Sequence, residues 1–115
     1  MSGLISNDSA EIKEFINESN TVVLVISGAQ NTQSQQLYND AIEVIANNNP
    51  AVWRILWVKN PDGLDSDLTT LFWPSDLAGA VVMSLGTGLN RQIKAHFSTG
   101  ELSGGLAIFE TFSKG

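Results

Sequence analysis

Four aspartates lie close together in the second half of the chain, and carboxylates can bind a metal ion or act in acid–base chemistry. They are Asp62, Asp65, Asp67 and Asp76. Read from Asp65, their spacing partly matches a calcium-binding loop, but Thr70 occupies the position of the required turn glycine. The same residues suit a helix cap and a polar turn. We therefore predict no metal site here.

The single histidine, His96, excludes a metal site built from several histidines. A catalytic histidine also needs a nucleophile and an orienting acid, and no Gly-x-Ser-x-Gly or similar pattern supplies them. Gly86-Thr87-Gly88 is interpreted as a hairpin turn, because phosphate-binding loops join a strand to a helix and this triplet is expected to join two strands. No catalytic residue, metal or cofactor is predicted.

The absence of cysteine restricts the chemistry further. The 115 residues contain no cysteine, which excludes disulfides, thiolate metal sites and thiol redox catalysis. Twelve acidic and six basic residues give a net charge of −6, and the basic residues are scattered, so we expect no nucleic-acid partner. The longest apolar run, Thr21–Ile26, is too short to span a membrane, and the N-terminus does not resemble a secretory signal. We expect one domain over residues 1–115, in the cytoplasm or inside a larger assembly, without a membrane partner.

Helices and strands alternate along the first half of the chain. The spacing of apolar residues predicts helices over 9–18 and 32–47, and Asp8 is the expected cap of the first. Between them, the β-branched run Thr21–Ile26 is typical of a central strand that is covered on both faces.

A second strand is predicted over 52–58, where Trp53, Ile55 and Trp57 share one face and are expected to pack beneath a helix. A short helix is then predicted to end before Pro74. Its inward-facing residues are Leu68, Leu71 and Phe72.

The last part of the chain has the pattern of a hairpin followed by a helix. Strands are predicted over 80–85 and 90–97, the second near a sheet edge, with Arg91, Ile93, Ala95 and Phe97 on one face. A final helix is predicted over 98–112. Helical crossovers imply parallel strands, and the short turn implies an antiparallel pair. We expect an α/β three-layer sandwich with a four-stranded mixed sheet flanked by helices.

This order of elements, from Asp8 to Phe112, resembles the thioredoxin fold without its first, peripheral strand. In that family, the strand matching Val22–Ile26 is followed by a Trp-Cys-Gly-Pro-Cys loop at a helix N-terminus. Asn31-Thr32-Gln33-Ser34 would occupy the positions of the dithiol tetrad. A serine hydroxyl is too weak an acid to replace a thiolate, so the resemblance implies a redox-inactive member.

The family also places a cis-proline before the strand that matches 80–85, where it helps to hold extended substrates. This chain has Leu77-Ala78-Gly79-Ala80 there, and a cis bond without proline is costly. The resemblance therefore implies a fold that is retained without the family's redox chemistry.

The resemblance also brings the tetrad-replacing loop, the segment before residue 80 and Trp73 into one region. Exposed aromatic residues are frequent at protein interfaces, and Phe72-Trp73-Pro74 is the leading candidate here. The predicted protein contacts are Gln30, Asn31, Thr32, Gln33, Phe72, Trp73, Pro74 and Gly79.

Three functions remain open. The preferred hypothesis is a non-catalytic protein-interaction module, an adaptor or a subunit of a larger complex, with a protein partner or self-association. The alternative is a small-ligand-binding protein or an enzyme that uses hydroxyl and carboxylate groups of the 27–34 loop. A further alternative is a structural subunit of a virus or phage particle, which the composition permits.

Overall fold

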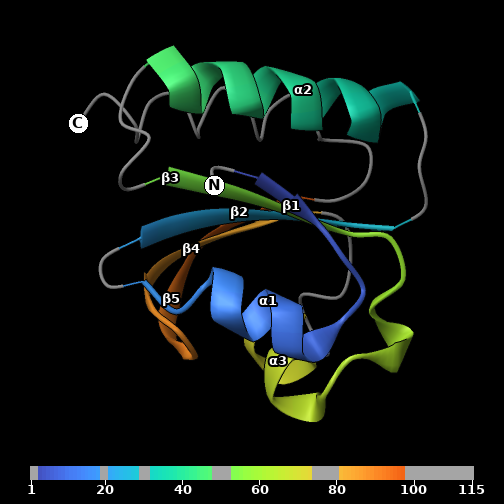
Figure 1. The fold of residues 1–115 in the computed structure, drawn as a ribbon, viewed down its shortest axis with the longest axis vertical. Coiled ribbons are helices and arrows are strands. Elements are labelled where there is room, and N and C mark those ends of the chain that lie inside the picture. The colour runs from blue at the N-terminus through green and yellow to red at the C-terminus, as the bar shows by residue number, and fades with distance from the viewer. Residues whose placement is uncertain (1–2, 19–20, 29–31, 48–52, 74–80, 98–115) are drawn as a thin grey trace.

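The computed structural model describes residues 3–18, 21–28, 32–47, 53–73 and 81–97, in which strands alternate with helices (Figure 1). The strands are β1 (Gly3–Ile5), β2 (Thr21–Ser27), β3 (Trp53–Val58), β4 (Val81–Thr87) and β5 (Asn90–Phe97). The helices are α1 (Ser9–Phe15), α2 (Thr32–Asn47), α3 (Ser66–Phe72) and the 3₁₀ turn η1 (Pro61–Gly63). None of the helices in these ranges is long and apolar enough to cross a membrane. The helix predicted over 98–112 lies outside the described residues.

The strands form one mixed sheet in the order β1-β3-β2-β4-β5. β1 and β2 run parallel to β3, whereas β4 is antiparallel to both β2 and β5. Helix α2 covers one face of the sheet, and α1 and α3 lie on the other (Figure 1). This arrangement confirms the predicted three-layer α/β sandwich with parallel early strands and an antiparallel hairpin.

The prediction of four strands is wrong by one, because β1 forms a fifth strand at the edge of the sheet. Gly3 pairs with Ile55 in parallel register. Three residues are too few to establish an alternating pattern in the sequence. Gly3 also allows a close approach to α2, because a Cβ atom at this position would overlap the side chain of Ile42 and lie 2.6 Å from the hydroxyl oxygen of Tyr38.

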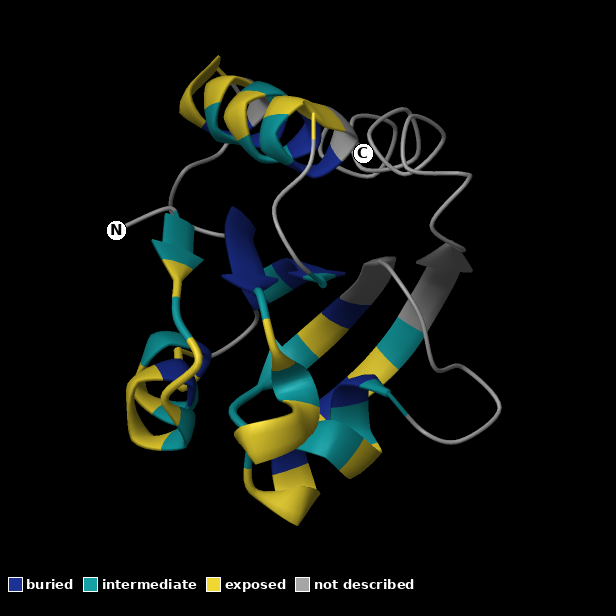
Figure 2. Cartoon of the chain, turned by 90° about the vertical axis from the view of Figure 1, so that its right-hand side faces the viewer, coloured by how far each residue is buried: buried dark blue, intermediate teal, exposed yellow. Residues whose placement is uncertain are grey.

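Two apolar cores lie on opposite faces of the sheet, and Figure 2 colours the buried residues of the strands and helices dark blue. Trp53, Ile55 and Trp57 of β3 are buried beneath α2, as their alternation predicts. Along β2, Leu24 joins the same core while Val23 joins the core under α1 and α3. The strand is therefore covered on both faces, as its continuous β-branched run predicts.

Helix α1 ends at Phe15, three residues before its predicted end. Its start is as expected, because the Asp8 carboxylate caps the helix by accepting a hydrogen bond from the Ala10 backbone N–H at 3.3 Å. At its other end, the carbonyl oxygen of Ile16 accepts a hydrogen bond from the Gly88 N–H at 2.9 Å. The β4–β5 turn thus satisfies a helix-end carbonyl without a further helical turn.

Strands β4 and β5 form the predicted hairpin, and β5 is an edge strand. The register shifts within the hairpin, because Ser84 pairs with Ile93 whereas Met83 pairs with Ala95. This shift in the backbone pairing interrupts the strict alternation that the sequence predicts for residues 91–97.

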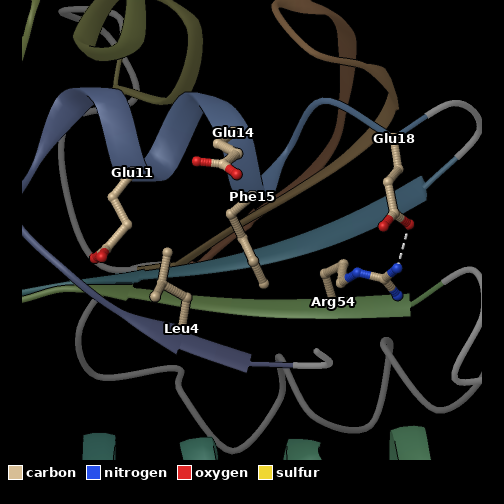
Figure 3. Close-up of a pocket in the computed structure, with 6 residues that line it drawn as sticks. All are labelled: Leu4, Glu11, Glu14, Phe15, Glu18 and Arg54. Atoms are coloured by element: carbon tan, nitrogen blue, oxygen red, sulfur yellow. Dashed lines mark hydrogen bonds and ion pairs between the residues drawn. The ribbon is translucent and has the colours of Figure 1, made fainter.

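Two arginines within the strands are buried, at 6% exposure for Arg54 and 9% for Arg91. The guanidinium of Arg54 forms an ion pair with Glu18 and donates a hydrogen bond to the carbonyl oxygen of Trp53 at 3.0 Å (Figure 3). Burial lowers the pKa of Arg91 from its ordinary value to about 10, so that Arg91 is still charged at neutral pH. The alternation in the sequence predicts which face of β5 carries Arg91, but it does not predict the partners of either arginine.

Candidate functional site

The carboxyl ends of the three parallel strands meet at one edge of the sheet. β1, β2 and β3 end at Ile5, Ser27 and Val58, and each strand is followed by a helix that begins near this edge. In α/β proteins, ligands commonly bind outside the carboxyl ends of parallel strands. We refer to the surface formed here by Ser27, η1 and α3 as the carboxyl-edge face.

Gly28 fixes the direction in which the chain leaves β2. Its N–H donates to the carbonyl oxygen of Val58 at 2.9 Å, and its own carbonyl oxygen accepts a hydrogen bond from Trp57 Nε1 at 3.0 Å. Its φ angle of +109° lies in a region that residues with side chains rarely adopt. The buried Trp57 thus holds the Gly28 carbonyl in place, and the Lys59 ammonium lies 5.2 Å from the centre of the Trp57 ring.

The turn after β3 is built by local hydrogen bonds. The Asn60 side-chain oxygen accepts from the Asp62 N–H at 3.1 Å, and the carbonyl of Pro61 accepts from the Leu64 N–H at the same distance. The Asn60 N–H in turn donates to Asn7 Oδ1 at 3.1 Å, which ties this turn to the segment after β1. The Asn-Pro-Asp-Gly sequence thus forms the polar turn that its composition predicts.

An open pocket of ≈ 450 Å³ lies on the carboxyl-edge face. Its lining residues are Ser27, Pro61, Asp62, Leu64, Ser66, Thr69 and Trp73. Pro61, Leu64 and Trp73 supply apolar surface, and three hydroxyl groups and one carboxylate supply polar groups. This combination suits contact with a side chain that has an apolar body.

Phe72 and Trp73 take different positions at the end of α3. Phe72 is fully buried with Leu68 in the core under α1 and α3, because residues four apart share one helix face. The prediction of Phe72 as a surface contact is therefore corrected. Trp73 is half-buried, lines the pocket and meets the Phe72 ring edge-on, with ring centres 5.8 Å apart. Its Nε1 is buried and has no acceptor among the described residues.

The structure describes only some of the other residues that were predicted as protein contacts. Gln30, Asn31, Pro74 and Gly79 lie outside the described residues. Thr32 is the exposed first residue of α2, and Gln33 follows it in the same helix. Within the described part of the 27–34 loop, residues 27–28 and 32–34, Ser27 lines the pocket together with Trp73.

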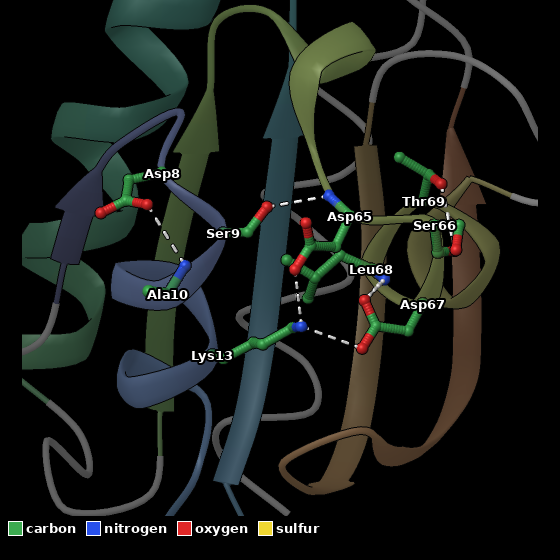
Figure 4. Close-up of polar contacts among 9 residues, drawn as sticks. All are labelled: Asp8, Ser9, Ala10, Lys13, Asp65, Ser66, Asp67, Leu68 and Thr69. Carbon is green, nitrogen blue, oxygen red and sulfur yellow. Dashed lines mark hydrogen bonds and ion pairs between the residues drawn. The ribbon is translucent and has the colours of Figure 1, made fainter.

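Two of the four aspartates, Asp65 and Asp67, connect α3 to α1 (Figure 4). Lys13 Nζ lies 2.9 Å from a carboxylate oxygen of Asp65 and 3.0 Å from one of Asp67. The hydrogen bonds with Asp65 and Asp67 raise the pKa of Lys13, and the hydrogen bond from Lys13 lowers the pKa of Asp67. The Asp65 N–H also donates to Ser9 Oγ at 2.8 Å. No group of three or more potential metal ligands occurs within the described residues.

Comparison with known proteins identifies the fold. No family model matches the chain, and no curated protein matches it. Among solved structures, it is similar to thioredoxin f2 of Chlamydomonas reinhardtii, with 12% sequence identity and a TM-score of 0.59. The match covers 100% of this chain and 98% of that one. The chain thus has a thioredoxin-like fold without cysteine, and so carries no thiol for disulfide exchange.

Proposed function

We propose that this protein is a non-catalytic interaction module, an adaptor or a subunit of a larger complex, that contacts a partner protein through the carboxyl-edge face. The observation that carries the proposal is the open pocket lined by Trp73 and Leu64 at this edge. The proposal combines this surface with the absence of cysteine, which removes thiol-based redox chemistry.

The shape and lining of the pocket favour a macromolecular contact. A pocket that encloses a small ligand buries most of the ligand's surface, whereas this pocket is open to solvent. Aromatic residues supply much of the binding energy at protein interfaces, and the half-buried Trp73 presents such a ring beside apolar Leu64. We therefore favour protein binding over the hydroxyl- and carboxylate-based enzyme.

The test uses arginine substitutions that add the same charge at two different places. Ser66→Arg puts a long side chain at the pocket rim, where Ser66 is exposed. Ala46→Arg is the control, because Ala46 is exposed on α2, across the sheet from α3. Tagged wild-type and variant proteins are used for affinity capture in the organism that encodes the chain, and sedimentation measures self-association.

We expect the wild type and Ala46→Arg to retain the same partner or to self-associate equally, and Ser66→Arg to weaken that association at least about tenfold. Equal folding of the three proteins is checked by circular dichroism and thermal unfolding. If all three proteins retain the same partner to the same extent, the carboxyl-edge face is not the contact. If all three are monomeric and retain nothing, the interaction function itself is rejected.

A further inference from the structure

A second pocket lies beside α1, on the side of the helix that faces β1 and β3 (Figure 3). It has a volume of ≈ 320 Å³ and lies between α1 and the neighbouring strands β1 and β3. Its lining residues are Leu4, Glu11, Glu14, Phe15, Glu18 and Arg54. None of these residues lines the pocket that contains Trp73.

The apolar part of this pocket comes from two elements. Leu4 of β1 and Phe15 of α1 are both half-buried, and both pack against the core under α1 and α3. Their remaining exposed surface borders the pocket, as the close-up shows (Figure 3). The aliphatic part of a long side chain can therefore lie on apolar surface here.

The charged part of the pocket has more carboxylates than cations. Glu11, Glu14 and Glu18 are exposed, and a spacing of three residues brings Glu11 and Glu14 to one side of α1. Arg54 forms its ion pair with Glu18. Among the described residues no cation pairs with Glu11 or Glu14, because Lys13 reaches across to α3. The pocket is thus complementary to a positive charge.

The strand that forms one side of the pocket also has a free edge. β1 is the outermost strand of the sheet, and within the described ranges no other strand pairs with its outer side. Leu4 belongs to the face toward α1, whereas Gly3 lies under Tyr38 and Ile42 on the face toward α2. A strand added beside β1 would therefore place a side chain next to Leu4, on the face that carries the glutamates.

From these observations together we propose that the pocket binds an extended segment of a partner protein that carries a lysine or arginine. The segment pairs with the free edge of β1, the stem of its basic side chain lies across Leu4 and Phe15, and the cationic head reaches Glu11 and Glu14. The carboxylates alone would attract any cation. The free strand edge and the apolar surface beside them select an extended peptide with a long basic side chain.

The probe for this site is a capped, fluorescently labelled heptapeptide in which valine and threonine surround one central lysine. Its binding to the purified protein is followed by fluorescence anisotropy, and the affected backbone amides are located by two-dimensional NMR. One variant, Glu11→Gln/Glu14→Gln, removes the free carboxylates without changing their size. The control, Glu43→Gln, removes an exposed carboxylate from α2 on the other face of the sheet.

We expect the double variant to bind the probe about tenfold more weakly, since two partly exposed ion pairs are lost. Glu43→Gln is expected to leave binding within a factor of two. A probe with glutamate in place of lysine should not bind, and a probe with N-methyl groups that block strand pairing should lose most of its affinity. The amides of Leu4 and Phe15 should shift in the NMR spectrum.

Three results would overturn the proposal. One is the absence of probe binding at millimolar concentration at low salt. Another is an equal loss of probe affinity in Glu43→Gln and in the double variant, because this would mean that the net charge of the protein alone attracts the probe. The third is full binding of the N-methylated probe, which means that the edge of β1 is not used. Ser66 lies outside this pocket. Partner binding by Ser66→Arg therefore tests the carboxyl-edge face, and probe binding by the double glutamate variant tests the pocket beside β1.

Discussion

Arg91 donates a hydrogen bond from Nη1 to the carbonyl oxygen of Thr21 at 2.8 Å, which joins β5 to the start of β2. The same side chain donates from Nε to the carbonyl of Gly88 at 2.8 Å, and from Nη2 to the carbonyl of Ile16. No carboxylate pairs with Arg91 among the described residues. Backbone carbonyls, including one at the end of α1, therefore stabilise this buried charge.

Replacement of Arg91 by methionine removes its hydrogen bond to the Thr21 carbonyl and one of the two hydrogen bonds to the Ile16 carbonyl, while it preserves most of the buried volume. We expect Arg91→Met to lower the free energy of unfolding by about 3 kcal/mol. Leaving buried acceptors unpaired costs more free energy than is gained by removing a buried charge. Urea denaturation measures the change. Arg91→Lys retains a charge but loses the planar fork, so its loss should be smaller. A methionine variant as stable as the wild type would contradict this explanation.

The ion pairs between Lys13 and the two aspartates give stability a defined pH dependence. The lowered pKa of Asp67 means that its contribution is present above its unfolded pKa of 3.8 and is lost as the pH falls through its folded pKa. The raised pKa of Lys13 means that its contribution is present below 10.5 and is lost as the pH rises through its folded pKa. The window of stabilisation thus lies between these limits.

We therefore expect the stability difference between the wild type and Lys13→Met to be constant from about pH 5 to about pH 9. The difference should shrink below about pH 4 and decrease with added salt, since these side chains are partly exposed. Thermal unfolding across this pH range measures it. A Glu43→Gln variant serves as the control for general charge effects. A difference that persists unchanged at pH 2 would mean that the ion pairs are not its source.

The sequence predicts the elements that have strong hydrophobic periodicity. It fails where contacts with residues distant in the sequence determine the bounds of an element. The long apolar stripe of α2 predicts its bounds of 32–47 correctly, and the β-branched run of β2 predicts a buried central strand. By contrast, α1 is shorter than predicted because Ile16 is bonded by the distant Gly88 and Arg91. β1 is missed because three residues contain no periodic signal.

The candidate sites are predicted less completely than the fold. Trp73 is identified from its residue type and its place before a proline, and it does line a pocket. Phe72 has the same residue class, but its helical register with Leu68 directs it into the core. The pocket beside β1 combines residues from β1, α1 and β3, and only the tertiary fold brings these together. Helical spacing of Glu11 and Glu14 is the one signal that the sequence contains for it.

Trp73 and Trp57 offer a matched comparison of two indole N–H groups. Trp57 Nε1 donates to the carbonyl of Gly28, whereas Trp73 Nε1 is buried without an acceptor among the described residues. We expect Trp73→Phe to leave the free energy of unfolding unchanged or to raise it by up to about 1 kcal/mol, because an unpaired buried donor is removed. Trp57→Phe should lower it by about 1–2 kcal/mol. Equal losses in the two variants, measured by chemical denaturation, would mean that Trp73 Nε1 does have a partner.

Gly86 and Gly63 differ in how much room the fold leaves for a side chain. A Cβ atom at Gly86 would overlap the carbonyl oxygen of Asn90 and lie 2.8 Å from the Cα of Arg91, and its φ angle is +151°. At Gly63 no heavy atom lies within 4 Å of such a Cβ atom. A side chain at position 86 is therefore excluded by backbone atoms, which cannot move away without opening the β4–β5 hairpin.

We expect Gly86→Ala to lower the free energy of unfolding by more than about 2 kcal/mol, because both its backbone conformation and its contacts exclude a methyl group. Gly63→Ala is the matched control and should leave stability unchanged or raise it by about 0.5 kcal/mol, since alanine reduces the entropy of the unfolded chain. Thermal and urea unfolding of both variants measure these changes. If Gly86→Ala is as stable as Gly63→Ala, the chain does not make the close approach between β4 and β5 that positions Arg91.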